Sequence, residues 1–182
     1  MWYCSGQSNM WLPVQYTFSR NKTVAAIKQG KYTNIRGIFS PSATTPTASG
    51  MWKTAPQAIE DGNETSPTYS LFEMGATCWY FAQELAERGL KTPIGIADTA
   101  IGGQRIEEFL NNKTYTGAIP CLDEVGGKPG GAAGGSPWTG HLFATQVMPF
   151  VDMTVKGWTW VRTQVVTPWA PSATTFGPRY PV

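Results

Sequence analysis

A helix followed closely by an apolar strand is the feature that most limits how this chain can fold. Residues 70–88 carry apolar side chains at helical spacing along one face, namely Leu71, Met74, Cys78, Phe81, Ala82 and Leu85. Ser70 and Glu73 have the spacing of a capping box at the helix start, and Gly89 is a typical helix stop. Residues 93–97 have the composition of a buried parallel strand, reached by a right-handed crossover through the helix. This unit predicts an α/β fold.

Shorter segments extend the α/β pattern over most of the chain. Strands are predicted at residues 2–4, 34–39 and 154–161, and short helices at 24–28 and 142–150. We therefore expect one domain over residues 1–162, with a mostly parallel sheet in flavodoxin-like order. Residues 163–182 contain four prolines and no helical or alternating period, which predicts a disordered tail.

The first predicted strand runs into a bend that displays a serine. After Trp2-Tyr3-Cys4 come Gly6, Gln7, Ser8 and Asn9. Open α/β folds place their chemistry at the carboxyl edge of the sheet, where such a bend would present the Ser8 side chain. A serine hydroxyl there can act as a nucleophile if a base removes its proton and N–H groups hold the oxyanion. The alternative is an ordinary turn in which Ser and Asn satisfy local backbone groups.

Two adjacent glycines, Gly102 and Gly103, follow the predicted strand at residues 93–97. Glycines at a strand-to-helix junction let the backbone approach a ligand closely and point free N–H groups at developing negative charge. A tight turn that needs positive φ would also require glycine here, and it is compatible with such a role. The pair is therefore a candidate oxyanion site.

Composition excludes several classes of function. The net charge is +2, charged residues make up 14% of the chain, and no Lys/Arg run is present. Binding to nucleic acid or to an anionic membrane is therefore not expected. Three Cys allow at most one intramolecular disulfide, and without paired Cys or His at ligand spacing no metal site is expected. No apolar run is long enough to span a bilayer.

The segment Gly6-Gln7-Ser8-Asn9-Met10 resembles the first conserved block of the sialate O-acetylesterase family, within the SGNH hydrolases. Residues 34–39, 78–85, 102–109 and 154–160 resemble further blocks of that family. The resemblance implies a three-layer SGNH-hydrolase fold and a serine esterase that acts without metal or cofactor. It implies hydrolysis of O-acetyl esters on sialic acids or other sugars, with Ser8 as the nucleophile. The amide of Gly102 or Gly103, with Gly102 favoured, would then contribute to the oxyanion hole.

The resemblance ends near Trp160. The family continues this strand as W-Y-Q-G-E and later supplies its catalytic His from a D-x-x-H block, but neither has a counterpart here. His141 is the single His and matches a segment outside the catalytic block, while Asp98 and Asp152 have no His to orient. We therefore expect a domain that is incomplete on its C-terminal side and impaired as an esterase.

Two alternatives to an esterase remain open at this point. The chain could be a catalytically inactive relative that binds acetylated glycans through the same cleft, or a fragment without a stable fold. Its location is open as well. The family and three N-glycosylation sequons, at Asn21, Asn63 and Asn112, suggest a secreted or lysosomal protein, although no signal peptide is recognisable in the sequence.

Overall fold

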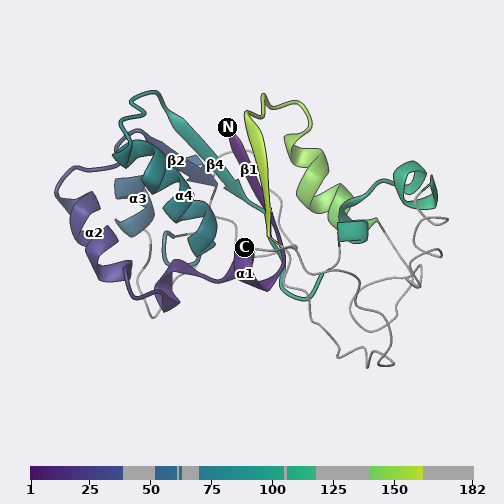
Figure 1. The fold of residues 1–182 in the computed structure, drawn as a ribbon, viewed down its shortest axis with the longest axis horizontal. Helices are drawn as coiled ribbons and strands as arrows, with labels where there is room; N and C mark the ends of the chain where they lie inside the picture. The colour runs from purple at the N-terminus through teal and green to yellow at the C-terminus, as the bar shows by residue number, and fades with distance from the viewer. Residues whose placement is uncertain (39–51, 61, 63–69, 105, 118–139, 162–182) are drawn as a thin grey trace, which may run out of the picture.

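A five-stranded, mostly parallel sheet forms the centre of the molecule (Figure 1). The computed structural model describes residues 1–38, 52–60, 62, 70–104, 106–117 and 140–161. The strands are β1 (Trp2–Gly6), β2 (Ile35–Ile38), β3 (Trp52–Thr54), β4 (Ile94–Asp98) and β5 (Gly157–Val161), in the order β3-β2-β4-β1-β5. All neighbours are parallel except β2 and β3. The predicted α/β class is confirmed.

The position of β4 differs from a simple flavodoxin order, in which the first strand lies between the second and the third. Here β4 lies between β1 and β2, pairing Asp98 with Cys4 on one side and Ala97 with Ile38 on the other. This central place suits β4, because its side chains from Ile94 to Asp98 are buried apart from the partly exposed Gly95. As a result β4 and β5 flank β1, and the segments that follow them lie on either side of its carboxyl end.

Helices cover both faces of the sheet, which gives three layers (Figure 1). One face carries α1 (Ser8–Trp11), η1 (Val14–Tyr16), α2 (Arg20–Lys28), α3 (Ala55–Glu60) and α4 (Ala76–Glu87). Their buried side chains, including Met10, Ile27 and Trp79, share one core with Ile35 and Ile96 of the sheet. The layer arrangement follows from each element burying its apolar face against the sheet.

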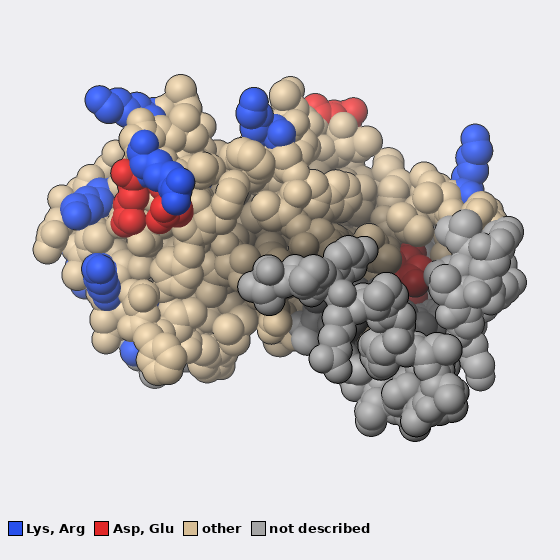
Figure 2. Space-filling view, viewed as in Figure 1, with Lys and Arg blue, Asp and Glu red and all other residues tan. Residues whose placement is uncertain are grey.

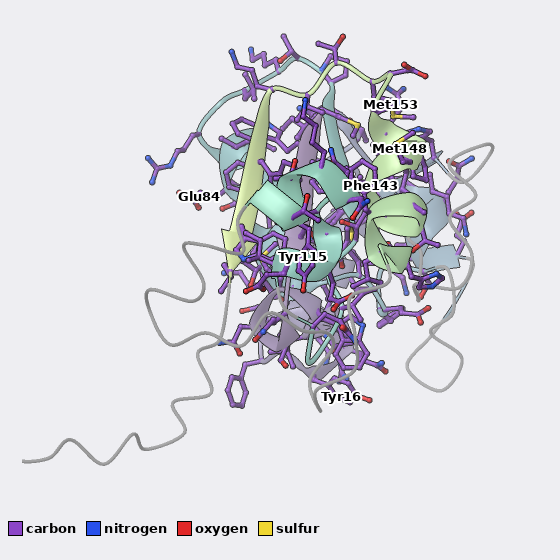
Figure 3. The ribbon with its side chains drawn as sticks, turned by 90° about the vertical axis from the view of Figure 1, so that its right-hand side faces the viewer. Tyr16, Glu84, Tyr115, Phe143, Met148 and Met153 are labelled. Atoms are coloured by element: carbon purple, nitrogen blue, oxygen red, sulfur yellow. A yellow bond between two sulfur atoms is a disulfide. The ribbon has the colours of Figure 1, made fainter. Side chains whose placement is uncertain are left out.

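The opposite face is covered by η3 (Phe143–Val147), a π-helical turn, and η4 (Met148–Phe150). Phe150 of η4 packs in a smaller core with Tyr3, Ile38 and Ala97, and the Tyr3 hydroxyl donates to the carbonyl of Gln146 at 2.7 Å. Figure 3 looks onto this layer and labels Phe143, Met148 and Met153. Two further short helices, η2 (Ile106–Phe109) and residues 112–117, follow the loop after β4.

The long helix begins later than the sequence predicts. α4 starts at Ala76, while residues 70–74 form turns, and the predicted capping box at Ser70 and Glu73 is wrong. The carbonyls of Phe72 and Met74 accept hydrogen bonds from the amides of Gln15 and Val14. This pairing holds residues 72–74 against residues 14 and 15 in a non-helical path, and the helix starts only after the pairing ends.

A disulfide ties the first strand to α4. Cys4 and Cys78 are bonded across 74 positions of sequence, and both are fully buried. Of the stripe predicted for this helix, Cys78 and Ala82 are buried and Phe81 and Leu85 are partly exposed. Since Cys4 lies four residues before Ser8, the bond anchors the strand that leads to the candidate nucleophile.

Most of the remaining predicted elements are present. Residues 24–28 lie in α2, 142–150 cover η3 and η4, and β2 and β5 occupy the predicted strand positions. The predicted tail, residues 163–182, lies outside the described residues. No helix within the described part of the chain is long and apolar enough to cross a bilayer. Figure 2 shows charged side chains of both signs scattered over the visible face, most of which is uncharged.

Candidate active site

Ser8 lies just beyond the carboxyl end of β1, as the first residue of α1, and its side chain is exposed. The strand ends at Gly6, whose φ of +143° favours glycine. A Cβ on Gly6 would also overlap the carbonyl oxygen of Val161 on β5. The next amide, that of Gln7, donates to this same carbonyl at 3.1 Å. The close approach of β1 to β5 at Gly6 therefore sets where the chain turns away from the sheet and presents Ser8.

The turn after Ser8 is fixed to the body of the protein. Met10 is fully buried, while the amide of Leu12 donates to the Ser8 carbonyl at 2.8 Å. The first turn of α4 adds two bonds: the Ala76 amide donates to the Leu12 carbonyl at 2.7 Å, and the Thr77 hydroxyl donates to the Asn9 carbonyl at 3.0 Å. The exposed Ser8 hydroxyl thus stands on a backbone held at several points.

The loop after β4 brings the glycine pair next to Ser8. The Ile101 amide donates to the Gly6 carbonyl at 3.0 Å, which aligns this loop with the end of β1. A Cβ placed on Gly102 would lie 3.8 Å from the Ser8 Oγ and 3.2 Å from the Trp11 Cε3. Gly102 therefore lies in contact range of both side chains, and a side chain at this position would crowd the space beside Ser8.

Gly102 and Gly103 form the centre of a tight turn. The amide of Gln104 donates to the Ile101 carbonyl at 3.4 Å, and Gly103 has a φ of +80°, the pattern of a type II turn. Within the described residues, neither glycine amide donates a hydrogen bond to another part of the chain. The turn explains why glycine is required at position 103, and it leaves both amides available to a ligand.

The two other side chains considered from the sequence lie elsewhere. His141 is exposed, two residues before η3, and Asp152 is exposed after η4. Neither lines the pocket beside Ser8. The described residues contain no group of three or more His, Cys, Asp or Glu side chains placed to share a metal ion. Ser8 and Gly102 are the predicted site residues that the structure brings together, with Gly103 next in the same turn.

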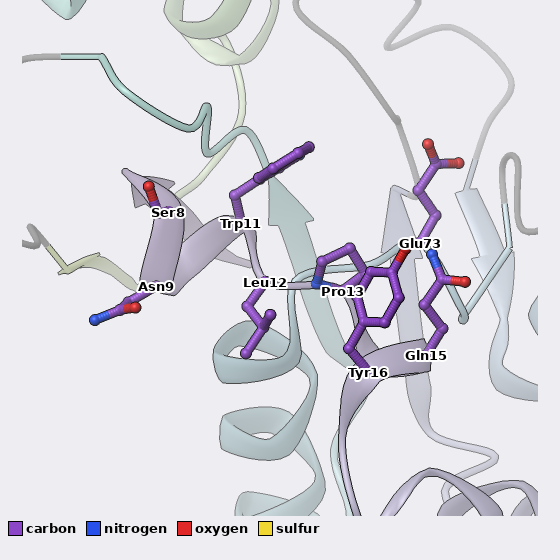
Figure 4. Close-up of a pocket in the computed structure, with 8 residues that line it drawn as sticks. All are labelled: Ser8, Asn9, Trp11, Leu12, Pro13, Gln15, Tyr16 and Glu73. Carbon is purple, nitrogen blue, oxygen red and sulfur yellow. The ribbon is translucent and has the colours of Figure 1, made fainter.

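A pocket of about 390 Å³ adjoins Ser8 (Figure 4). It is lined by Ser8, Asn9, Trp11, Leu12, Pro13, Gln15, Tyr16 and Glu73. Trp11 is 46% exposed and Tyr16 70% exposed, so their rings are open to a ligand. In Figure 4, Ser8 and Asn9 lie at one end of the pocket, and Gln15 and Glu73 lie at the other. Aromatic rings with a few polar groups are typical of the walls of small-molecule sites.

Asp98, the last residue of β4, is a buried carboxyl close to this site whose importance the sequence did not reveal. Its Oδ2 accepts the Gly75 amide at 2.6 Å, and its Oδ1 accepts the Ala100 amide at 3.2 Å. Burial raises the pKa of Asp98 to about 7, although both of these hydrogen bonds act to lower it. One signal was present in the sequence, because an acid directly ends an otherwise apolar strand.

Comparisons with known proteins point to one group of esterases. No family model matches the chain. The sialate O-acetylesterase of Pongo abelii is 28% identical over 173 residues, and that of Homo sapiens is 25% identical over 163 residues. Both alignments cover 89% of this chain and 30% of the relative. The Mus musculus sialate O-acetylesterase is 28% identical over 142 residues, 71% of this chain and 24% of the relative.

A solved structure has a similar fold. A carbohydrate acetylesterase from Xanthomonas citri matches 89% of this chain and 32% of its own, with a TM-score of 0.56 and 24% identity. The chain therefore spans about 30% of the length of the curated relatives that it matches.

Proposed function

The chain belongs to the sialate O-acetylesterase family, and from this premise we propose that it carries the nucleophile half of a serine esterase site for O-acetylated sugars. The observation that carries the proposal is the placement of Ser8, exposed at the carboxyl end of β1 and next to Gly102. The acyl donor would be an O-acetyl ester of a sialic acid or of another sugar.

In the proposed reaction the Ser8 Oγ attacks the acetyl carbonyl carbon. A new C–O bond forms, the bond to the sugar oxygen breaks, and the sugar leaves with the proton that Ser8 has lost. Water then attacks the acetyl-Ser8 intermediate, which releases acetate and restores the hydroxyl. The chemistry needs a base for the Ser8 proton and donors for the oxyanion, and these two requirements are met to different degrees.

Donors for the oxyanion are available beside Ser8. The turn at Gly102 and Gly103 lies next to the Ser8 hydroxyl, and both amides lack partners within the described residues. Gly102 is the better candidate, since its missing side chain leaves open the space that faces Ser8 and Trp11. Preorganised backbone donors of this type stabilise the developing charge without reorganisation, and one such donor contributes roughly 10²–10³-fold in rate.

The base is the weak part of the site. The sequence has one His, and His141 is not among the residues that line the pocket at Ser8. A serine hydroxyl at its ordinary pKa is a weak nucleophile. Removal of a triad member in serine proteases leaves a residual rate of roughly 10³–10⁴-fold over water, which binding and the oxyanion hole supply. We expect slow hydrolysis of this order from the chain.

The pocket beside Ser8 suits the sugar part of such a substrate. Trp11 and Tyr16 offer partly exposed rings, and Gln15 and Glu73 offer polar atoms at the far end. A pyranose has apolar C–H faces and a polar rim of hydroxyls, which matches this division of the wall. The inactive glycan-binding alternative uses the same pocket and differs in having no Ser8-dependent turnover.

An acetate-release assay tests the proposal on the purified chain with O-acetylated sugars. Four chains are compared: native, Ser8→Ala, His141→Ala, and Ser19→Ala as an exposed serine control. We expect turnover far below about 1 s⁻¹, a value typical of competent enzymes, that is lost in Ser8→Ala and kept in the other two variants.

Equal acetate release by native and Ser8→Ala chains would contradict the esterase proposal, and retained sugar binding in both would favour the glycan-binding alternative. Turnover of about 1 s⁻¹ or faster, lost in His141→Ala as well as in Ser8→Ala, would contradict the expected slow rate and identify His141 as the base.

A further inference from the structure

The Asp98 carboxyl connects two backbone segments that are far apart in the sequence. Gly75 immediately precedes α4, and its amide donates to Oδ2. Ala100 lies in the loop after β4, and its amide donates to Oδ1. Each oxygen of this one buried side chain therefore accepts a hydrogen bond from a different segment.

The first of these segments, at Gly75, binds the backbone turn that follows Ser8. Gly75 packs so closely that a Cβ there would overlap the Met10 carbonyl and lie 2.5 Å from the Asp98 Oδ2. The next two residues, Ala76 and Thr77, donate to the carbonyls of Leu12 and Asn9. Gly75 is thus the point where Asp98 reaches the backbone that presents Ser8.

The second segment carries the glycine turn. Ala100 is followed by Ile101, whose amide donates to the Gly6 carbonyl, and then by Gly102. The Thr99 amide donates to the Cys4 carbonyl at 2.8 Å. Gly102 lies two positions after Ala100, whose amide Asp98 accepts, so a shift at Ala100 moves the glycine turn directly.

On the basis of the proposed role of Ser8, we infer that Asp98 is a positioning residue for the same reaction. Its ionised carboxylate accepts both amides at once and so fixes the distance between the Ser8 hydroxyl and the Gly102 amide. A protonated carboxyl, or an Asn side chain, has one carbonyl oxygen and one group that bears hydrogen. Either change leaves the Gly75 or the Ala100 amide without a full acceptor, and the two segments can then move apart.

Among the residues that the structure describes, few other titratable groups surround Asp98. On β1 the coupled group is Tyr3, whose pKa is raised to about 12, chiefly by burial and to a lesser degree by Asp98. On the α4 side, Glu73 lies two residues before Gly75, and Cys78 is held in the disulfide. α1, β5 and residues 99–104 carry no titratable side chain, and on β2 the one such residue is the exposed Arg36. Between pH 5.5 and 8.5 the bridge is therefore expected to respond through Asp98 itself.

The test compares native chain with Asp98→Asn, and with Asp152→Asn as an exposed control. Single-turnover acetylation of Ser8 by p-nitrophenyl acetate is followed by mass spectrometry at several pH values, and amide hydrogen exchange is measured at Gly75 and Ala100. We expect the native-to-Asp98→Asn rate ratio to rise as the pH increases through about 7. The ratio should reach roughly 10- to 100-fold, the cost of a misplacement of about 1 Å. Asp152→Asn should behave as native.

If Ser8 is acetylated but the native-to-Asp98→Asn rate ratio does not change with pH, the inference about Asp98 is overturned and the proposed function is not. Native chain that is not acetylated at Ser8 would instead contradict the proposed function, and the positioning role with it. If Asp98→Asn does not fold, the native chain still provides the test. Its Gly75 and Ala100 amides should exchange faster, after correction for intrinsic exchange, as the pH falls through about 7; unchanged protection would contradict the bridge.

Discussion

At the scale of single residues, the backbone around Ser8 depends on glycines at three close approaches. Gly6 passes Val161, Gly75 passes Met10 and Asp98, and Gly102 passes Trp11 and the Ser8 hydroxyl. Gly6 and Gly102 stand out in the sequence because each follows a predicted strand. Gly75 does not, since it lies inside the range predicted as helix, and its role depends on a contact with a distant carboxyl.

One prediction at the residue scale concerns Asp98 and the dependence of the free energy of unfolding on pH. The pKa of Asp98 is raised by burial from 3.8 to about 7, so the folded chain binds a proton that the unfolded chain releases between these pH values. The stability linked to this proton is fully present below pH 3.8 and is lost as the pH rises through about 7. The corresponding decrease in the free energy of unfolding is up to about 4 kcal/mol.

Urea unfolding of native chain, Asp98→Asn and Asp152→Asn between pH 4 and 8 measures this effect. The native chain and the Asp152→Asn control should lose stability across that range relative to Asp98→Asn, whose side chain does not titrate. If the free energies of unfolding of native chain and Asp98→Asn changed with pH in parallel, Asp98 would ionise as easily in the folded chain as in the unfolded one, which would contradict the prediction.

At the scale of elements, the disulfide between β1 and α4 constrains the strand that leads to Ser8, the proposed nucleophile. It closes a loop across 74 positions of sequence. In the chain-entropy model a loop of this size stabilises the folded state by about 4 kcal/mol. The bond also holds Cys4 of β1 against α4, the helix whose first turn binds the Ser8 turn.

Replacing both cysteines tests this constraint. Cys4→Ala with Cys78→Ala should lower the free energy of unfolding by roughly 2–4 kcal/mol, measured by urea unfolding under non-reducing conditions, whereas Cys121→Ser should leave it near native. A double variant that unfolds at the same urea concentration as native chain would contradict a stabilising role for the bond.

The sequence predicts the helices and strands better than it predicts which of them lie side by side in the fold. The period of apolar residues and the turn formers identified β1, β2, β4, β5 and α2, because these signals are local. The start of α4 and the position of β4 were not predictable in the same way. The first depends on hydrogen bonds from Val14 and Gln15 to residues 72 and 74, and the second on which strand β2 pairs with. Both are contacts between distant segments.

At the scale of the whole molecule, the site is assembled from segments far apart in the sequence at one edge of the sheet. The order β4-β1-β5 places the segment after β1, with Ser8, beside the loop after β4, with Gly102. Sequence patterns named both residues, and the sheet order explains why they meet. The pocket at Ser8 was not predictable, because Tyr16 and Glu73 come together only through the pairing of residues 13–15 with residues 72–75.

The central claim is that Ser8 is an acyl-accepting nucleophile, and direct identification of the acetylated residue tests it. Native chain, Ser8→Ala and Ser19→Ala are each incubated with p-nitrophenyl acetate and stopped in acid, and the adduct is located by peptide mass spectrometry. Soluble imidazole is added in a parallel series as an external general base. We predict an acetyl group on Ser8 in native and Ser19→Ala chains, formed faster with imidazole, and none at that position in Ser8→Ala. Acetyl groups found on lysines alone, at equal rates in all three chains, would contradict the claim.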